Sequence, residues 1–498
     1  MSGPVGGVAS ASDPTVMRGP RRAFDGPRVV LLVAIGVWAV TLDRLATLRQ
    51  NRFGTFGFDL GIYDQAIWLL SRVKDPFITV RGLEAFGHHV NVILLLLAPF
   101  YRLGAGPKFL LFVQVVAQAS GAGAVFLLAR DRIRDRWLAC ALGAVYLLHP
   151  TSQWLVWEFF HPDAVSIGPL LFAYWASRER RWGWFSFAAV IALCCKEDVA
   201  LAFIVIGLLI AWRGDRRLGY GIGAGALAWY VVATRLLIPW QNGIGPFYDS
   251  FFGTLGSNPL QVSVNVFRHP VTTWKLVTQH DRIVYVWHMA APYAFAPVLS
   301  PSTLTIALPM LAVNLVSSFP YTRDAHFHYS ALVLVGATIA TVEGVARLPT
   351  LNAKRVLVGV LVVASFATTI AWGPSPIGRQ YHNGWWPLGS SPVYAVDRAA
   401  VALIPKDAAV SASYDYVPHL AHRRRVYEFP VPWRDVNWGV RGENLDDPIH
   451  VQWLLVDRRL LDVDGASVLH DLLLHQFVVR SQVDGIVVAQ RVHNGPPP

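Results

Sequence analysis

Two acidic residues, Asp59 and Asp64, stand among glycines and aromatic residues just after the first apolar run of the sequence. A carboxylate that is partly removed from water has a raised pKa and can serve as a general base. The same spacing also fits the start of a helix, with Asp59 as its cap and Asp64 solvated. Both interpretations stay open at this point.

Glu158 and His161 stand three residues apart and are followed by Pro162 and Asp163. On a helix, residues at this spacing are neighbours. An acid and an imidazole placed together can bind a divalent metal ion or orient a sugar hydroxyl. Alternatively, these residues start a helix, with proline in the first turn and Asp163 as an early acid.

Three consecutive ionisable residues, Lys196, Glu197 and Asp198, separate two apolar segments with almost no loop between them. Charges at membrane depth are costly and usually functional. A lysine in this position could neutralise a lipid phosphate while the acids hold the lysine or a metal ion. The alternative is a tight turn whose charges compensate one another.

Arg323, His326 and His328 precede a later apolar segment. The two histidines diverge on a helix because they are two residues apart, so only an extended segment would let them share a metal ion. Arg323 is better suited to a phosphate group. His88 and His89 either join the same cavity or anchor a short apolar run at the level of the lipid headgroups.

The elements that must position these groups are membrane helices. The 498 residues are 54% hydrophobic and 15% charged, and their mean hydropathy is +0.40, which is typical of an integral membrane protein. The net charge of +11 does not indicate a nucleic-acid partner, because the arginines gather in short stretches between apolar segments. Cys140, Cys194 and Cys195 lie inside apolar segments, so neither a disulfide framework nor a thiolate metal site is indicated.

The apolar segments predict an α-helical polytopic membrane protein with about eleven transmembrane helices. The short run 90–100 is predicted to be an interfacial helix, because the arginine-rich loops then all fall on one side. That threading puts the N-terminus in the cytoplasm and all the ionisable stretches described above on the outer face. The predicted spans are 29–48, 107–129, 137–148, 164–176, 182–195, 199–212, 218–238, 283–299, 302–319, 329–345 and 356–372.

Three regions follow from this pattern. Residues 1–28 are predicted to be a disordered cytoplasmic tail, 29–372 the transmembrane domain, and 373–498 a small extracytoplasmic α/β domain. The abundance of arginine, alanine and glycine suggests a GC-rich bacterial genome, and hence a multi-pass protein of the bacterial plasma membrane. Within the last region, strand-length runs occur at 408–413, 425–429, 451–457, 477–480 and 485–490, and helical spacing occurs at 466–475.

Five motifs occur in a specific order, namely FGFDLGIYDQAIW, HHVNVILLLLAPFY, EFFHPDA, CCKEDVAL and RDAHFHYSALV. Through them the sequence resembles a family of prokaryotic polytopic membrane proteins, a domain of unknown function related to the GT-C superfamily of polyprenyl-phosphate-sugar-dependent glycosyltransferases. The resemblance covers roughly residues 30–345 and extends into the C-terminal region. It implies a GT-C-like fold, a lipid-linked sugar donor and an acidic residue in the first outer loop. Asp59 takes that acidic role, with Asp64 as the competing candidate, and 90–100 takes that of an interfacial helix.

We therefore predict an inverting glycosyltransferase that moves a sugar from a polyprenyl-phosphate donor to an envelope glycan, lipid or protein. Asp59 would activate the acceptor hydroxyl, and Lys196 and Arg323 would stabilise the leaving phosphate. A divalent metal ion is left open as a cofactor, and nucleic acid is excluded as a partner. The alternatives are a transporter or flippase of a lipid-linked or anionic substrate, and a non-catalytic scaffold for envelope assembly. The other predicted substrate-binding residues are Glu158, His161, Glu197, Asp198, His326 and His328.

Overall fold

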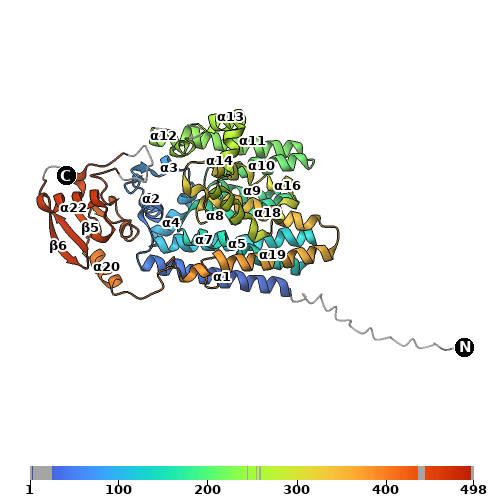
Figure 1. Ribbon diagram of the computed structural model, residues 1–498, viewed down its shortest axis with the longest axis horizontal. Helices are drawn as coiled ribbons and strands as arrows, with labels where there is room; N and C mark the ends of the chain where they lie inside the picture. Colours follow the sequence, from blue (N-terminus) through green and yellow to red (C-terminus); the bar gives the residue numbers. More distant parts are fainter. Residues whose placement is uncertain are drawn as a thin grey trace.

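The computed structural model describes residue 3 and residues 25–243, 245–253, 255–256, 259–435 and 444–494. It consists of a large helical domain with a small sheet region at one end, coloured red in Figure 1. Most of the predicted tail, 1–28, lies outside the described residues. Residues 26–28 already belong to the first helix, α1 (Gly26–Asn51).

Five helices in the described part of the chain are long and apolar enough to cross a membrane. The predicted number of about eleven spans stays a prediction, because several of the other apolar helices are short. The long helices are α1, α5 (Pro107–Ile133), Arg216–Asn242, His328–Arg347 and α19 (Leu351–Trp372). The shorter apolar helices are α4 (Ile93–Arg102), α6 (Arg136–Leu148), α9 (Trp182–Leu193) and α10 (Val199–Trp212).

The centre of the helical domain is α18 (Ala331–Arg347), in which every residue from Ala331 to Val345 is buried. A helix that is apolar on all sides is expected to be surrounded by other helices. Here α5, α8 (Pro162–Arg178) and the short η5 (Ala296–Leu299) pack against it. By contrast, α1 and α19 are mostly exposed along their apolar windows, as expected for helices that face lipid.

Helices α10 and α11 (Arg216–Val232) approach each other through glycines. A Cβ at Gly207 would lie 2.6 Å from the amide nitrogen of Gly223, and one at Gly219 would lie 2.3 Å from that of Ala211. Small residues let membrane helices pack backbone to backbone, where the hydrophobic effect adds little. This contact fixes the position of α10, whose first residue follows Asp198.

The single helices predicted at 283–299 and 302–319 are each broken in the structure. Pro292 and Pro297 supply no backbone N–H, so a continuous helix through them would lose hydrogen bonds. Between them Ala294 and Phe295 adopt left-handed backbone conformations, with φ of 44° and 58°. The resulting pieces are α15 (His280–Ala290), η4 (Ala291–Tyr293), η5, α16 (Pro301–Leu304) and α17 (Leu308–Val316).

The polar stretch after α1 folds into a compact first loop. It starts with the π-helical turn η1 (Gly57–Gly61), which runs directly into α2 (Ile62–Ser71). The segment 90–100, predicted to be interfacial, forms the short helix α4, which packs against α2. The other elements of the loop are β1 (Phe77–Ile78), β2 (Leu83–Glu84) and α3 (Ala85–His88).

The C-terminal region forms a five-stranded sheet in the order β4-β3-β5-β7-β6. The predicted strands and the predicted helix all occur there, whereas α20 (Val393–Ala402) was not predicted. Strands β4, β3 and β5 run parallel, and β5, β7 and β6 run antiparallel. The bounds are β3 (Val410–Ala412), β4 (Val426–Glu428), β5 (Trp453–Asp457), β6 (Phe477–Val483), β7 (Ile486–Arg491) and α22 (Val463–His475).

The C-terminal region packs against the first loop. The amide nitrogen of Gly57 donates to the carbonyl oxygen of Tyr414 over 2.8 Å, and a Cβ at Gly57 would lie 2.7 Å from that of Val417. The C-terminal region therefore packs against η1, the turn that carries Asp59.

The remaining α-helices are α7 (Pro150–Trp157), α12 (Ile238–Asn242), α13 (Pro259–Arg268), α14 (Pro270–Val277) and α21 (Val417–Leu420).

Candidate functional site

Turns from distant parts of the sequence meet at the end of the helical domain that faces the C-terminal region. They are η1, the end of the first loop, the α7–α8 turn, the α9–α10 turn and η7 (His328–Ser330), which opens the helix of α18. We call the side chains that they bring together the ionisable cluster. Its members are Asp59, His89, Glu158, His161, Asp163, Lys196, Glu197, Asp198 and His328.

Asp59 is the accessible acid of the ionisable cluster. Its Oδ1 lies 3.4 Å from Nε2 of His161, and its side chain is 35% exposed whereas that of His161 is 3% exposed. Asp59 does not cap a helix, because it lies inside η1 and no side chain caps that turn. A half-exposed carboxylate backed by a buried imidazole can accept a proton from an incoming hydroxyl.

Glu158, His161 and His328 form a compact group of three ligand-type side chains. Nδ1 of His328 lies 2.7 Å from Oε1 of Glu158, and the His161 and His328 rings stack with centroids 4.0 Å apart. One donor atom from each residue lies within 4.8 Å of the others, so the three could hold a metal ion. Two imidazoles and a carboxylate are donors that Zn²⁺ accepts readily. Burial, reinforced by Asp59 and Asp163, raises the pKa of Glu158.

The α9–α10 turn places Lys196 between two carboxylates. Its Nζ lies 3.2 Å from Oδ1 of Asp163 and 3.5 Å from Oδ2 of Asp198. Burial by itself would lower the pKa of Lys196, but the two carboxylates outweigh it and raise that pKa, so the ammonium group stays charged. Asp198, from the same turn, thus balances part of the charge of Lys196. Asp163, in the first turn of α8, supplies the second carboxylate.

Glu197 joins the same turn to the first loop. Nδ1 of His89 lies 2.7 Å from Oε1 of Glu197, and the amide nitrogen of Val90 donates to Oε2 over 3.1 Å. His89 therefore belongs to the ionisable cluster instead of standing apart at headgroup level. His88 lies beside it, with ring centroids 4.5 Å apart, and burial together with the charges of His89 and Arg81 lowers its pKa.

A cavity of about 90 Å³ adjoins Lys196. His89, Lys196 and Asp198 provide its charged and polar end, and aromatic and aliphatic side chains line most of the remainder. The cavity thus combines a charged end with a mostly apolar lining. The other lining residues are Leu201, Tyr230, Tyr248, Phe251, Phe252, Met310, Val313, Ser317, Thr322 and Tyr329.

Asp64 lies apart from the ionisable cluster. It is fully buried, contrary to the solvated position that the helix-start interpretation gave it. The hydroxyl of Tyr101 donates to its Oδ1 over 2.6 Å, and Nε2 of His422 lies 3.2 Å from the same oxygen. Asp64 thus joins α2 to α4 and to the C-terminal region, which is a structural position.

Arg323 and His326 also have partners outside the ionisable cluster. The Arg323 guanidinium pairs with Asp281, and it donates to the carbonyl oxygen of Phe319 over 3.1 Å. His326 pairs with Asp324 and stacks on Trp385, with ring centroids 5.7 Å apart. The two histidines of the His-Phe-His motif therefore point to different partners, as their spacing predicts.

Sequence reasoning did not select Gln114 or Arg49, although both hold the α7–α8 turn. Gln114 accepts from the amide nitrogen of His161 over 2.5 Å and donates to the carbonyl oxygens of Leu155 and Phe159. Arg49 donates to the carbonyl oxygen of Trp157 over 2.5 Å, and its guanidinium carbon lies 4.0 Å from that ring's centroid. The sequence feature that could have identified both residues is a polar side chain within an apolar helix or near its end, because such a side chain requires a partner.

The apolar helices and the likeness to a solved structure together define the class, which is a polytopic membrane protein with the GT-C glycosyltransferase fold. ArnT from Cupriavidus metallidurans, bound to undecaprenyl phosphate, superposes with a TM-score of 0.51 at 13% identity over 94% of this chain and 99% of that chain. The chain belongs to the family described as predicted membrane protein (DUF2079), whose model matches residues 49–487. The family and fold expected from the five motifs are thereby confirmed.

Two further solved structures are less similar. ArnT from the same organism in the apo state gives a TM-score of 0.44 at 13% identity over 93% of this chain and 97% of that chain. The Archaeoglobus fulgidus oligosaccharyltransferase, in complex with zinc and sulfate, gives 0.39 at 15% identity over 86% of this chain and 68% of that chain. No curated protein matches the sequence significantly.

Proposed function

We propose that this protein is an inverting glycosyltransferase of the bacterial plasma membrane. It takes a sugar from a polyprenyl-phosphate donor and transfers it to an envelope acceptor on the extracytoplasmic face. The observation that carries this proposal is the position of Asp59, half-exposed and 3.4 Å from His161, in the same cluster as the buried Lys196 and its apolar cavity. The GT-C fold agrees with this reaction but does not identify the substrates.

Asp59 takes the role of general base. It removes the proton of the acceptor hydroxyl as that oxygen bonds to the anomeric carbon, and the bond from this carbon to the phosphate oxygen breaks. Attack on the face opposite the leaving group inverts the anomeric configuration. His161 is a positioning residue, because it contacts the Asp59 carboxylate from a buried site.

Lys196 takes the role of phosphate stabiliser. Negative charge grows on the leaving phosphate, and a preorganised cation placed where that charge develops lowers the barrier. The ammonium group is held by Asp163 and Asp198 beside the apolar cavity, which suits the first part of a lipid chain. Arg323 has a smaller role in this proposal than its sequence position indicated, because Asp281 occupies its guanidinium.

The group Glu158, His161 and His328 supplies donors for a divalent metal ion. In this proposal the ion, when bound, neutralises negative charge among the carboxylates of the ionisable cluster. The residues themselves keep the α7–α8 turn and η7 together, since Glu158 and His328 contact each other directly.

The proposal is tested in cells that lack the gene and are complemented with variant chains. Lipid-linked sugars and envelope glycans are measured by mass spectrometry. Asp59→Asn is expected to accumulate the same polyprenyl-phosphate sugar, and to lose the same glycan, as cells without the gene. The matched control is Asp75→Asn, an exposed acid of the same first loop, which should restore the wild-type pattern.

Equal amounts of each variant in the membrane fraction exclude a loss of expression or of membrane insertion. A wild-type glycan pattern from Asp59→Asn contradicts the proposed role of Asp59. Movement of a lipid-linked sugar across proteoliposomes without a covalent product contradicts glycosyl transfer and favours the flippase instead.

A further inference from the structure

A second polar cavity lies at the other end of the helices that carry the ionisable cluster. It has a volume of about 560 Å³, and its lining includes Arg178, Arg180 and Arg213, together with Trp182, Ile210 and Asp215. Helix α10 runs from the ionisable cluster to this cavity, and its 14 residues span about 21 Å. The cavity is therefore a separate place in the molecule.

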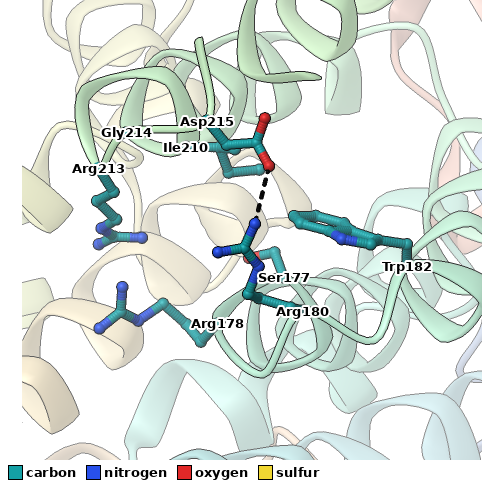
Figure 2. A pocket seen from close by; sticks show the side chains of 8 residues that line it. All are labelled: Ser177, Arg178, Arg180, Trp182, Ile210, Arg213, Gly214 and Asp215. Atoms are coloured by element: carbon teal, nitrogen blue, oxygen red, sulfur yellow. Dashed lines mark hydrogen bonds and ion pairs between the residues drawn. The ribbon is translucent and has the colours of Figure 1, made fainter. Parts of the chain in front are cut away.

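Two tight turns build the cavity. Arg178 ends α8, and Arg180 follows in the α8–α9 turn with a left-handed backbone, φ 54°. Arg213 and Gly214 form the α10–α11 turn, where Gly214 has φ 115°. Figure 2 shows the Arg178 and Arg213 guanidinium groups facing the same space, with Arg180 between them and Trp182.

The ion pairs around this cavity contain more arginines than carboxylates. Nε of Arg132 and Nε of Arg178 each lie 3.0 Å from the buried Glu343. Arg180 lies 3.3 Å from Asp215. Four arginines, including Arg213, thus face two carboxylates, which leaves two positive charges over.

Arg213 carries one of these unbalanced charges. Its guanidinium donates to the hydroxyl of Tyr174 over 2.9 Å, and that hydroxyl in turn lies 3.1 Å from Oε1 of Glu343. Among the residues that the structure describes, no carboxylate forms an ion pair with Arg213. A guanidinium in this position retains donors for an anion that enters the cavity.

We propose that this cavity binds a phosphate group. Guanidinium groups bind phosphate oxygens in pairs of parallel hydrogen bonds, and two negative charges would balance the local excess. Basic pockets between transmembrane helices are known to hold phospholipid headgroups. Trp182 and Ile210 supply an apolar wall for the part of the ligand that adjoins its phosphate. The phosphate comes from a lipid headgroup or from a soluble phosphate compound.

The test uses the purified full-length chain in detergent micelles. One arm titrates phosphatidylglycerol against phosphatidylcholine and counts bound lipid by native mass spectrometry. The other arm titrates inorganic phosphate and follows the thermal unfolding midpoint. Arg213→Gln and Arg180→Gln are expected to weaken binding about tenfold, the order of one charge-assisted hydrogen bond. The matched control Arg217→Gln, an exposed arginine at the start of α11, should bind like wild type.

The two arms separate the sources of the phosphate. Selective retention of phosphatidylglycerol assigns the cavity to a lipid headgroup, and protection by inorganic phosphate alone assigns it to a soluble ligand. The proposal is overturned if the variants bind both ligands as wild type does, or if Arg217→Gln loses as much as they do. Should a variant misfold, phenylglyoxal labelling of the wild-type protein decides instead, since bound ligand must protect Arg213 and not Arg217.

Discussion

Asp59 and His161 lie 3.4 Å apart although one belongs to the first loop and the other to the start of α8. Asp59 is the more exposed of the two, whereas the backbone of His161 is held by Gln114 and its buried ring stacks on His328. The contact between Asp59 and His161 brings together two distant parts of the chain, both of which the proposed reaction needs. It also makes their functional coupling measurable.

Asp59 and His161 are expected to act as one unit. Removing the general base by Asp59→Asn should lower the rate of transfer by about 10² to 10⁴-fold. His161→Gln should lower it less, and the double variant should lose no more than Asp59→Asn alone, because His161 acts through Asp59. Rates of sugar transfer for the four proteins provide the measurement. Losses that multiply would show that the two residues act independently.

A divalent metal ion is expected to bind through His328 and not through His326. His328 belongs to the group with Glu158 and His161, whereas His326 pairs with Asp324. His328→Asn should weaken Zn²⁺ or Mn²⁺ binding by at least about tenfold, as the loss of a metal-site residue does. Isothermal titration calorimetry on purified protein measures the affinity, and His326→Asn is the matched control. Equal metal affinities of the His328→Asn and His326→Asn variants would contradict a metal site that contains His328.

The contact between the helical domain and the C-terminal region is expected to depend on pH through His422. Burial opposes protonation of His422, but the Asp64 carboxylate outweighs it and raises the pKa of the imidazole. A raised pKa in the folded state means that this stabilisation is fully present below about pH 6.5. It is then lost as the pH rises through the folded-state pKa.

The thermal unfolding midpoint, measured from pH 5.5 to pH 8.5, tests this dependence. His422→Asn should remove the part of the pH dependence that comes from this pair and lower the midpoint at acidic pH. His419→Asn is the comparison, because burial lowers the pKa of His419 to about 4 and the residue stays neutral over this range. An unchanged profile in His422→Asn would assign the pH dependence to other groups.

The packing of α10 on α11 is expected to tolerate no side chain at Gly219. A Cβ there would lie 2.3 Å from the amide nitrogen of Ala211, whereas one at Gly221 would meet nothing within 4 Å. Gly219→Ala should destabilise the fold by about 1–3 kcal/mol through overpacking. Gly221→Ala should be neutral or slightly stabilising, because alanine favours helix. Thermal unfolding of the two variants measures the difference, and equal midpoints would contradict this packing.

The sequence by itself determined the kind of protein and most of its local structure. The cost of placing polar groups in lipid or in a protein core leaves a pattern in the sequence. Apolar segments and the arginine-rich turns between them predicted membrane helices, and short apolar runs near the C-terminus predicted strands. That same cost marked Glu158 and Lys196 as residues worth attention, because a charge between apolar segments requires a partner. The start of α8 at Pro162 was also readable, since proline suits the first turn of a helix.

Only the tertiary structure decided which of these residues meet. Asp59 and Asp64 stand five positions apart, yet one lies in the ionisable cluster and the other is buried against Tyr101 and His422. The sequence position of Arg323 suits a phosphate ligand, but in the folded protein its guanidinium pairs with Asp281. The physical reason is that a local pattern records where a polar group is costly, but its partner comes from a distant segment, and the packing of the helices alone brings the two together.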